Sequence, residues 1–221
     1  MAGQWLKTSK NWSDISNNSV SETLTTRRAC RSFLKRSVPE GLILDLVDKA
    51  RRTPTAGNSQ GVEFLILHKE NEVKEFWDVS LKGKDKKKFG FPGLLKAPVL
   101  VIPLGVPSLY INRYKEEDKN NTNLGKGIKE WKVPYWLTDA AFSTMALQLL
   151  AIENGLASCF IGLFDREERI KENFSVPETH EALGVLIMGY PDFENEVTGR
   201  SQKRKRRPLE DVVHLGKWTP R

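Results

Sequence analysis

The segment from Thr138 to Asn154, TDAAFSTMALQLLAIEN, constrains the fold more than any other part of the chain. Its composition and spacing predict one long helix, which Gly155 is well placed to end. The apolar side chains cover much of the helix circumference, and they are Phe142, Met145, Ala146, Leu149, Leu150 and Ile152. Such a helix must be covered on more than one side. We therefore expect it in the core or at an interface between two subunits.

The remaining predicted elements are a mixture of helices and strands. Helices are expected over residues 21–30, with Ser21 as the cap, 39–52 and 165–174. Short apolar strands are expected over residues 62–68, 98–104, 158–161 and 183–190. Because helices and strands do not alternate strictly, the expected fold class is α+β.

The 221 residues are enough for one domain with a sizeable core. We expect residues 1–20 to form an N-terminal arm and residues 21–221 to form a single domain. The stretch 112–132 is polar, rich in Asn and Lys, and lacks a clear period. It is interpreted either as a mobile surface loop or as a lid, within an excursion at about 105–136.

A membrane or secreted protein is not expected. The first twenty residues contain no apolar block that could serve as a secretory signal. The apolar stretch 98–111 is interrupted by two prolines and a glycine, so it cannot span a membrane as one helix. The two cysteines, Cys30 and Cys159, are too few for a disulfide framework or a cysteine-based zinc site. A reducing, cytoplasmic location is the simplest expectation.

Motifs of self-contained catalysis are missing from the sequence. It contains no GxGxxG, GxxxxGK[ST], HExxH or GxSxG pattern. The histidines His68, His180 and His214 are far apart and have no metal-ligand spacing. Cys159 is more simply explained as a small buried side chain than as a nucleophile. No metal site and no catalytic side chain are therefore predicted.

A basic run lies near the end of the chain. Six of the eight residues from 200 to 207 are basic, and they account for all but one of the net positive charges. Such a run can be a nuclear address, a nucleic-acid patch, a solvated tail or a clamp for a small anion. Because no base-reading motif or interleaved aromatic residues accompany it, nucleic-acid binding is disfavoured.

Two further segments are suited to binding an anionic, flat ligand. Arg27, Arg28 and Arg31 lie in a predicted helix, where Arg27 and Arg31 would share a face, and three such cations repel one another unless an anion lies among them. The loop TPTAGNSQ, 53–60, can bring backbone N–H and C=O groups close to a ligand. Taken alone, the arginines could be a solvated helix face and the loop a simple connection.

Taken together and in order, these segments resemble the FMN-dependent nitroreductase family, including its relatives that dehalogenate iodotyrosine. The resemblance spans most of residues 21–215. It is carried by TTRRACRSF at 25–33, ARRTPTAGNSQ at 50–60, NGLASCFIGLFD at 154–165, and GYPD followed by KRRPLEDVVH within 189–214. The resemblance implies a mixed sheet flanked by helices and an intertwined homodimer.

The resemblance also implies which residues contact the FMN phosphate. Arg27 would hold the phosphate, and Arg28 the phosphate or the ribityl chain. Ala29 occupies a position where the family usually has a phosphate-binding serine, so one hydrogen bond would be lost. Arg204 and Arg206, shortly before Pro208, match the late phosphate ligands of the family. The basic run is therefore interpreted as an anion clamp.

The contacts with the isoalloxazine ring follow in the same way. Arg31 would approach the N1/O2 edge, where its charge would stabilise reduced flavin. Ile161 and Gly162 would offer backbone groups near the pyrimidine end or N5. The small-residue loop would line the ring, in part from the second subunit, through Pro54, Thr55, Ala56 and Asn58.

By this resemblance, the function is an oxidoreductase that passes reducing equivalents from NAD(P)H through FMN to a small acceptor, such as a nitroaromatic or a quinone, by a ping-pong mechanism. Its partners would be a second copy of the chain and a small-molecule substrate, not nucleic acid or a membrane. The alternative is a non-enzymatic flavin- or nucleotide-binding module, or a basic protein that docks on acidic partners.

Overall fold

The computed structural model describes residues 19–82, 88–197, 199 and 204–218. The arm expected over residues 1–20 lies almost entirely outside this range. The described part is built on a five-stranded sheet, in which β1, β2, β5 and β3 follow one another and β4 pairs with β2. The strands are β1 Val62–Leu67, β2 Val99–Gly105, β3 Ala157–Ile161, β4 Glu181–Ala182 and β5 Val185–Gly189.

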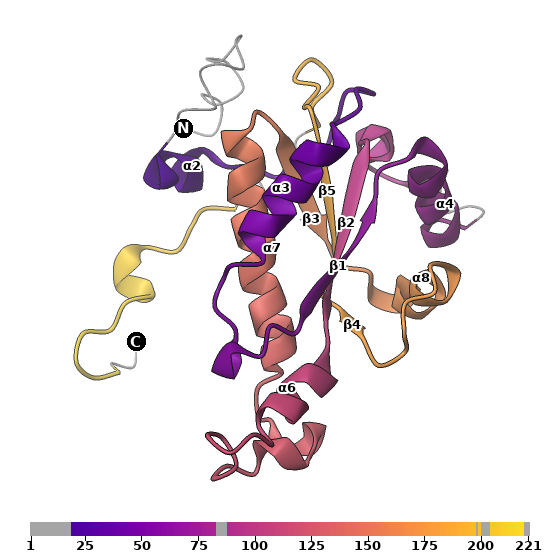
Figure 1. Cartoon of the computed structure of the whole chain (residues 1–221). Helices are drawn as coiled ribbons and strands as arrows, with labels where there is room; N and C mark the ends of the chain where they lie inside the picture. Colours follow the sequence, from indigo (N-terminus) through magenta and orange to yellow (C-terminus); the bar gives the residue numbers. More distant parts are fainter. Residues whose placement is uncertain (1–18, 83–87, 198, 200–203, 219–221) are drawn as a thin grey trace.

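All the described strand pairs are antiparallel, and helices cover both faces of the sheet. One face packs against α3, Glu40–Ala50, and α7, Tyr135–Glu153, whereas the other packs against α4, Glu70–Ser80, and α8, Glu167–Asn173 (Figure 1). The central strand β2 is buried along its whole length. This double cover explains its unbroken apolar sequence and confirms the α+β prediction.

The long apolar helix α7 lies against the sheet, as its sequence predicts. It begins at Tyr135, directly after Pro134, and ends at Glu153. Leu147 and Ala151 are fully buried against the sheet and α3, whereas Phe142 is 50% exposed. The core of one chain therefore covers only part of this helix, and an apolar strip remains on its outer side.

The prediction of a helix over residues 21–30 is wrong at its C-terminal end. Helix α2 spans Val20–Thr26, and its cap is Ser19 rather than Ser21. The chain beyond Thr26 is not helical, because Cys30 N–H donates to the Ser158 carbonyl of β3 and Leu34 N–H donates to the Tyr190 carbonyl. Arg27 and Arg31 therefore do not share a helix face.

Among the described residues, two α-helices are absent from the predicted elements. One is α4, in which Val73, Phe76, Trp77 and Ser80 are buried at helical spacing, a signal that the sequence does contain. The other is α6, Pro107–Arg113, which starts at a proline after β2. The predicted helix over 165–174 starts with a 3₁₀ turn, Phe164–Arg166, before α8.

The polar excursion contains more order than its sequence suggests. It folds around Tyr110, Trp131 and Trp136, which form a small aromatic core with Tyr114 and Leu124 beside it. The Trp131 indole N–H donates to the Leu124 carbonyl at 2.9 Å. Short 3₁₀ turns, Leu124–Lys126 and Ile128–Glu130, complete the segment, which lies at one end of the molecule below α6 in Figure 1. Within the described residues, no helix has the length and apolar character to cross a membrane.

Candidate functional site

Near α2, the charges of basic residues from opposite ends of the chain act on one another. The pKa of the half-buried Arg27 guanidinium is lowered, first by burial and then by the positive charges of Arg28 and Arg206. No carboxylate is among the charges that act on Arg27. Arg204 and Arg206 themselves are exposed. The fold thus gathers cations that repel one another, an arrangement that an anion would relieve.

Arg28 has a local structural contact in addition to its charge. Its Nη1 donates to the carbonyls of Thr25, Thr26 and Arg27 at 3.0, 3.2 and 2.8 Å. These are carbonyls at the end of α2 that lack partners within the helix. A cation at the C-terminus of a helix is also favoured by the helix dipole. Arg28 therefore stabilises the turn that presents Arg27.

Glu196 fixes the extended arginine segment, and the sequence analysis missed it. Its carboxylate accepts from the Arg31 N–H at 2.9 and 3.0 Å and from the Ser32 N–H at 2.9 Å. The two segments are 165 residues apart in the sequence, so no local spacing reveals the contact. Glu196 replaces the hydrogen bonds that a longer helix would have supplied.

The Arg31 side chain is packed between two parts of the chain. Its guanidinium lies over the Phe91 ring, with 5.2 Å from Cζ to the ring centroid. On another side lies Gly199, where an added Cβ would come within 2.7 Å of Cζ. A larger residue at this position would have to displace the guanidinium, which is the far end of a flexible side chain. Arg31 is thus packed between these parts of the chain and close to Cys159, whose pKa its charge acts to lower.

Neither cysteine has the properties of a nucleophile. Cys159 is 3% exposed, and burial raises its pKa despite the opposing charge of Arg31. Burial is also the main reason for the raised pKa of Cys30, and the negative charge of Glu196 adds to it. Burial therefore favours the protonated form of both thiols, and Cys159 is a small buried side chain, as the sequence analysis expects. No group of three potential metal ligands occurs among the described residues.

The small-residue loop is anchored to α7 by a buried carboxylate. Ala56 N–H donates to Asp139 Oδ2 at 2.8 Å, and the Tyr110 hydroxyl donates to the same oxygen at 2.7 Å. Asp139 is 2% exposed, and it too was missed by the sequence analysis. Thr55 supports the loop from within by accepting from Gln60 N–H at 2.9 Å. Of the four predicted ring contacts, Pro54 and Asn58 are exposed, and Thr55 and Ala56 are half-buried.

One chain does not bring all the predicted contacts together. The loop leads into β1 at one edge of the sheet, whereas Ile161 and Gly162 lie at the end of β3 on the opposite edge. Two strands separate β1 from β3, a distance of about 14 Å at the usual strand spacing. The arginine segment also belongs to the β3 side, through the Cys30–Ser158 hydrogen bond.

Comparison with solved structures gives the class of this fold, a nitroreductase-like fold. A nitroreductase family protein from Clostridium difficile 630 is 22% identical with a TM-score of 0.64, covering 91% of this chain and all of that chain. The Bacillus megaterium protein NfrA2 is 20% identical with a TM-score of 0.68, covering 91% of this chain and 76% of that chain.

Sequence comparison gives the family itself. The model described as the Nitroreductase family matches residues 24–190, and the chain therefore belongs to this family. A Methanothermobacter thermautotrophicus protein, provisionally named an NADH dehydrogenase/NAD(P)H nitroreductase, is 28% identical, over 92% of this chain and 90% of its own length. An Archaeoglobus fulgidus protein with the same provisional name is 25% identical, over 87% and 95%.

Proposed function

We propose that this protein is an FMN-dependent oxidoreductase that passes reducing equivalents from NAD(P)H to a small acceptor, such as a nitroaromatic or a quinone. The observation that carries the proposal is that the positive charge of Arg206, from the other end of the chain, acts on Arg27 with no carboxylate charge to offset it. Family membership supports the redox chemistry, and the names of the archaeal relatives support NAD(P)H as the donor.

The basic group fits the phosphate of FMN. Arg27 and Arg206 would grip it from two sides, Arg204 would add a third charge, and Arg28 would contribute from the end of α2. Such charge-assisted hydrogen bonds are the stronger kind in proteins. Ala29 offers no hydroxyl, so the arginines and backbone N–H groups would supply the contacts. The exposed positions of Arg204 and Arg206 leave them free to turn toward a ligand.

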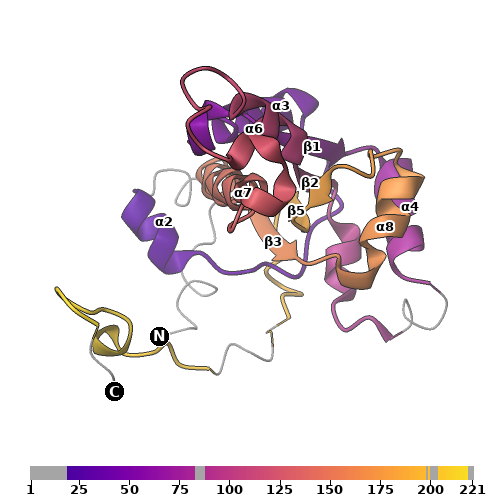
Figure 2. The same cartoon turned by 90° about the horizontal axis from the view of Figure 1, so that it is seen from below.

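The ring contacts support a homodimer with FMN between the subunits. Because the loop at 54–58 and the Ile161–Gly162 turn lie on opposite edges of the sheet, a flat ring that touches both needs a second copy. The C-terminal segment extends away from the body of the molecule on the side of α2 (Figures 1 and 2), and its Leu215 and Trp218 are 91% and 79% exposed. With Phe142 on α7, these apolar groups would be covered by the partner.

Bound FMN would supply the hydride chemistry, and the donor would leave before the acceptor takes the same place. Arg31, held by Phe91 and Gly199, would stabilise negative charge on the reduced ring. No acid–base side chain is assigned, since water or the substrate can supply protons. In this proposal, residues 21–221 are one cytoplasmic FMN-binding domain, and the excursion at 105–136 is the lid that selects the acceptor.

The absorbance spectrum of the purified protein under nitrogen tests the function. We expect a flavin spectrum that NADPH or NADH bleaches and that a quinone or nitroaromatic restores. Two results together would instead support a basic protein that docks on acidic partners. The purified protein would be colourless and would gain no NAD(P)H-reducible flavin spectrum when FMN is added, and it would bind acidic polymers in a strongly salt-dependent way.

A substitution on the outer side of α7 tests the dimer. Phe142→Glu places a charge on the half-exposed apolar strip, so we expect sedimentation to show a monomer of 25.1 kDa that has lost FMN. The matched control is Leu44→Glu, the same change at a residue of α3 that is 52% exposed. A parent protein that sediments as a monomer and still holds FMN would contradict the proposal.

A further inference from the structure

The small-residue loop has an unusual backbone, which is held partly by hydrogen bonds within the loop, such as Asn58 N–H to the Thr55 carbonyl at 2.8 Å, and partly by contacts from outside. Gly57, Asn58 and Gln60 have φ angles of 62°, 56° and 52°. Residues other than glycine adopt this left-handed region rarely, because Cβ comes too close to the backbone. Such a conformation persists only where surrounding contacts enforce it. Contacts from outside the loop therefore add to its internal hydrogen bonds in fixing its shape.

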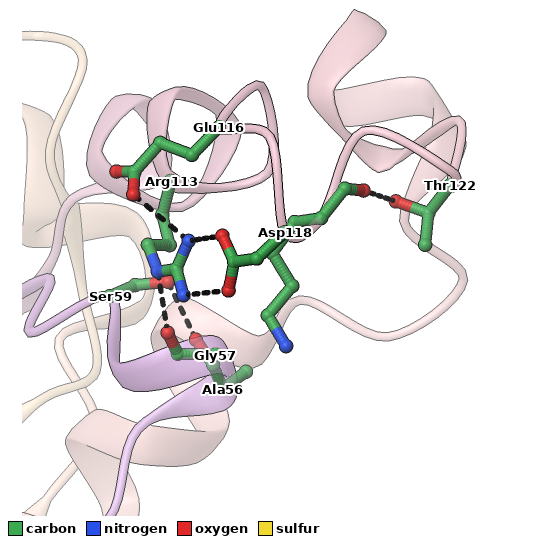
Figure 3. Close-up of polar contacts among 8 residues, drawn as sticks. Ala56, Gly57, Ser59, Arg113, Glu116, Asp118 and Thr122 are labelled. Atoms are coloured by element: carbon green, nitrogen blue, oxygen red, sulfur yellow. Dashed lines mark hydrogen bonds and ion pairs between the residues drawn. The ribbon is translucent and has the colours of Figure 1, made fainter.

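Two neighbouring backbone groups of the loop are held from outside. On one side Asp139 accepts from Ala56 N–H. On the other, Arg113 Nε donates to the Gly57 carbonyl at 2.8 Å (Figure 3). Tyr114, which follows Arg113, lies against Gly57 so closely that an added Cβ would be 2.8 Å from its ring. The C-terminal end of α6 thus covers the most curved part of the loop.

The Arg113 side chain is itself held in one orientation. Its Nη1 and Nη2 donate to the two carboxylate oxygens of Asp118 at 2.6 Å each, and Nη1 also contacts Glu116 at 3.0 Å (Figure 3). A planar guanidinium paired at both terminal nitrogens has little freedom to rotate. With the terminal nitrogens paired in this way, Nε points at the Gly57 carbonyl (Figure 3). The side chain of Arg113 is 21% exposed, so the contact is partly shielded from water.

We propose that Arg113 is a positioning residue, which holds the loop in the shape that the flavin ring would contact, and that Asp118 orients Arg113 for this role. Gly57 lies between Ala56 and Asn58, two of the predicted ring contacts, so the proposal rests on the proposed function for its link to flavin. Asp118 belongs to the excursion. The excursion and the ring-binding loop are therefore mechanically coupled, and an acceptor that displaces residues around Asp118 changes the flavin site.

Amide hydrogen exchange of the flavin-free protein tests whether Arg113 holds the loop in place. Arg113→Lys keeps the charge but lacks the planar fork that bonds both Asp118 oxygens while Nε bonds Gly57, and Asp118→Asn weakens the pair without touching the loop. In both variants we expect the amides of residues 56–60 to exchange roughly tenfold faster than in the parent. The matched control is Asp45→Asn, which removes an exposed Asp–Lys pair of 2.7 Å on α3 and should leave these amides unchanged.

A second measurement on the FMN-loaded protein tests the link to flavin. Both variants should shift the visible flavin spectrum and reduction potential and raise the FMN dissociation constant roughly fivefold, whereas Asp45→Asn should not. Parental exchange rates in both variants would overturn the proposal. Faster exchange with unchanged spectrum, potential and affinity would overturn the positioning role toward flavin. If the parent protein binds no FMN, the proposed function is refuted. Faster exchange in the two variants would then still establish that Arg113 holds the loop.

Discussion

Replacement of Arg27 or Arg206 by alanine is expected to weaken FMN binding severely. Each change removes a charge-assisted hydrogen bond to phosphate, worth about 1–3 kcal/mol, or roughly a 5- to 150-fold rise in the dissociation constant. In the double variant the two losses add if the arginines grip different oxygens. Titration of the flavin-free proteins with FMN, followed by flavin fluorescence, measures all three constants.

The control for this experiment is Lys205→Ala, which removes one positive charge from the same basic run. It should change the dissociation constant little, because a general field effect of one exposed charge is largely screened by salt. The flavin-free Arg206→Ala protein should also be no less stable than the parent, since Arg206 repels Arg27. If Arg206→Ala keeps FMN through dialysis as well as the parent does, the proposed clamp is wrong.

The basic residues of the proposed phosphate site show which features can be predicted from local sequence and which cannot. The charge runs are visible without a structure, but the conformation of the first one is not. The helix prediction fails at Arg27 because Glu196, at 165 residues from Arg31, and β3 supply the backbone partners of this segment. Tertiary contacts of this kind override helix propensity, and the spacing of residues in the sequence does not reveal them. The approach of Arg206 to Arg27 is likewise a property of the fold.

The position of the small-residue loop can also be predicted from sequence, but the contacts that fix its shape cannot. Gly57 and Asn58 are typical of a tight turn, so its location is predictable from composition. The groups that fix it, Asp139 and Arg113, come from α7 and α6. Asp139 lies in a helix that the sequence does predict, yet only the folded structure shows that its carboxylate faces inward and not toward water. The sheet order, which separates the two predicted halves of the ring site, also depends on long-range pairing.

Replacement of Asp139 by alanine is expected to cause a large loss of stability. The change leaves the fully buried Tyr110 hydroxyl and the Ala56 N–H without their acceptor. One buried and one half-buried donor left unsatisfied cost about 2–5 kcal/mol in the free energy of unfolding. That is a large part of the roughly 5–15 kcal/mol that holds a typical domain together. Urea denaturation followed by tryptophan fluorescence measures the loss.

Asparagine at the same position separates the hydrogen bonds from the charge. Both donors bind the same oxygen, Oδ2, and a side-chain amide oxygen can accept from both. We therefore expect Asp139→Asn to lose less stability than Asp139→Ala. Burial and Asp139 both raise the pKa of Tyr110, so its hydroxyl remains a donor throughout the neutral range and pH should not change this ranking.

A double-mutant cycle with Tyr110→Phe isolates the hydroxyl–carboxylate pair. Once Asp139 is alanine, loss of the hydroxyl removes an unsatisfied group, so the double variant should be more stable than the sum of the single losses predicts. The expected coupling is about 1–3 kcal/mol, as for groups in direct contact within one buried network. Additive losses would show that the two side chains act independently. An Asp139→Ala protein as stable as the parent would show that water replaces the carboxylate, and that this anchor does not determine the position of the ring-binding loop.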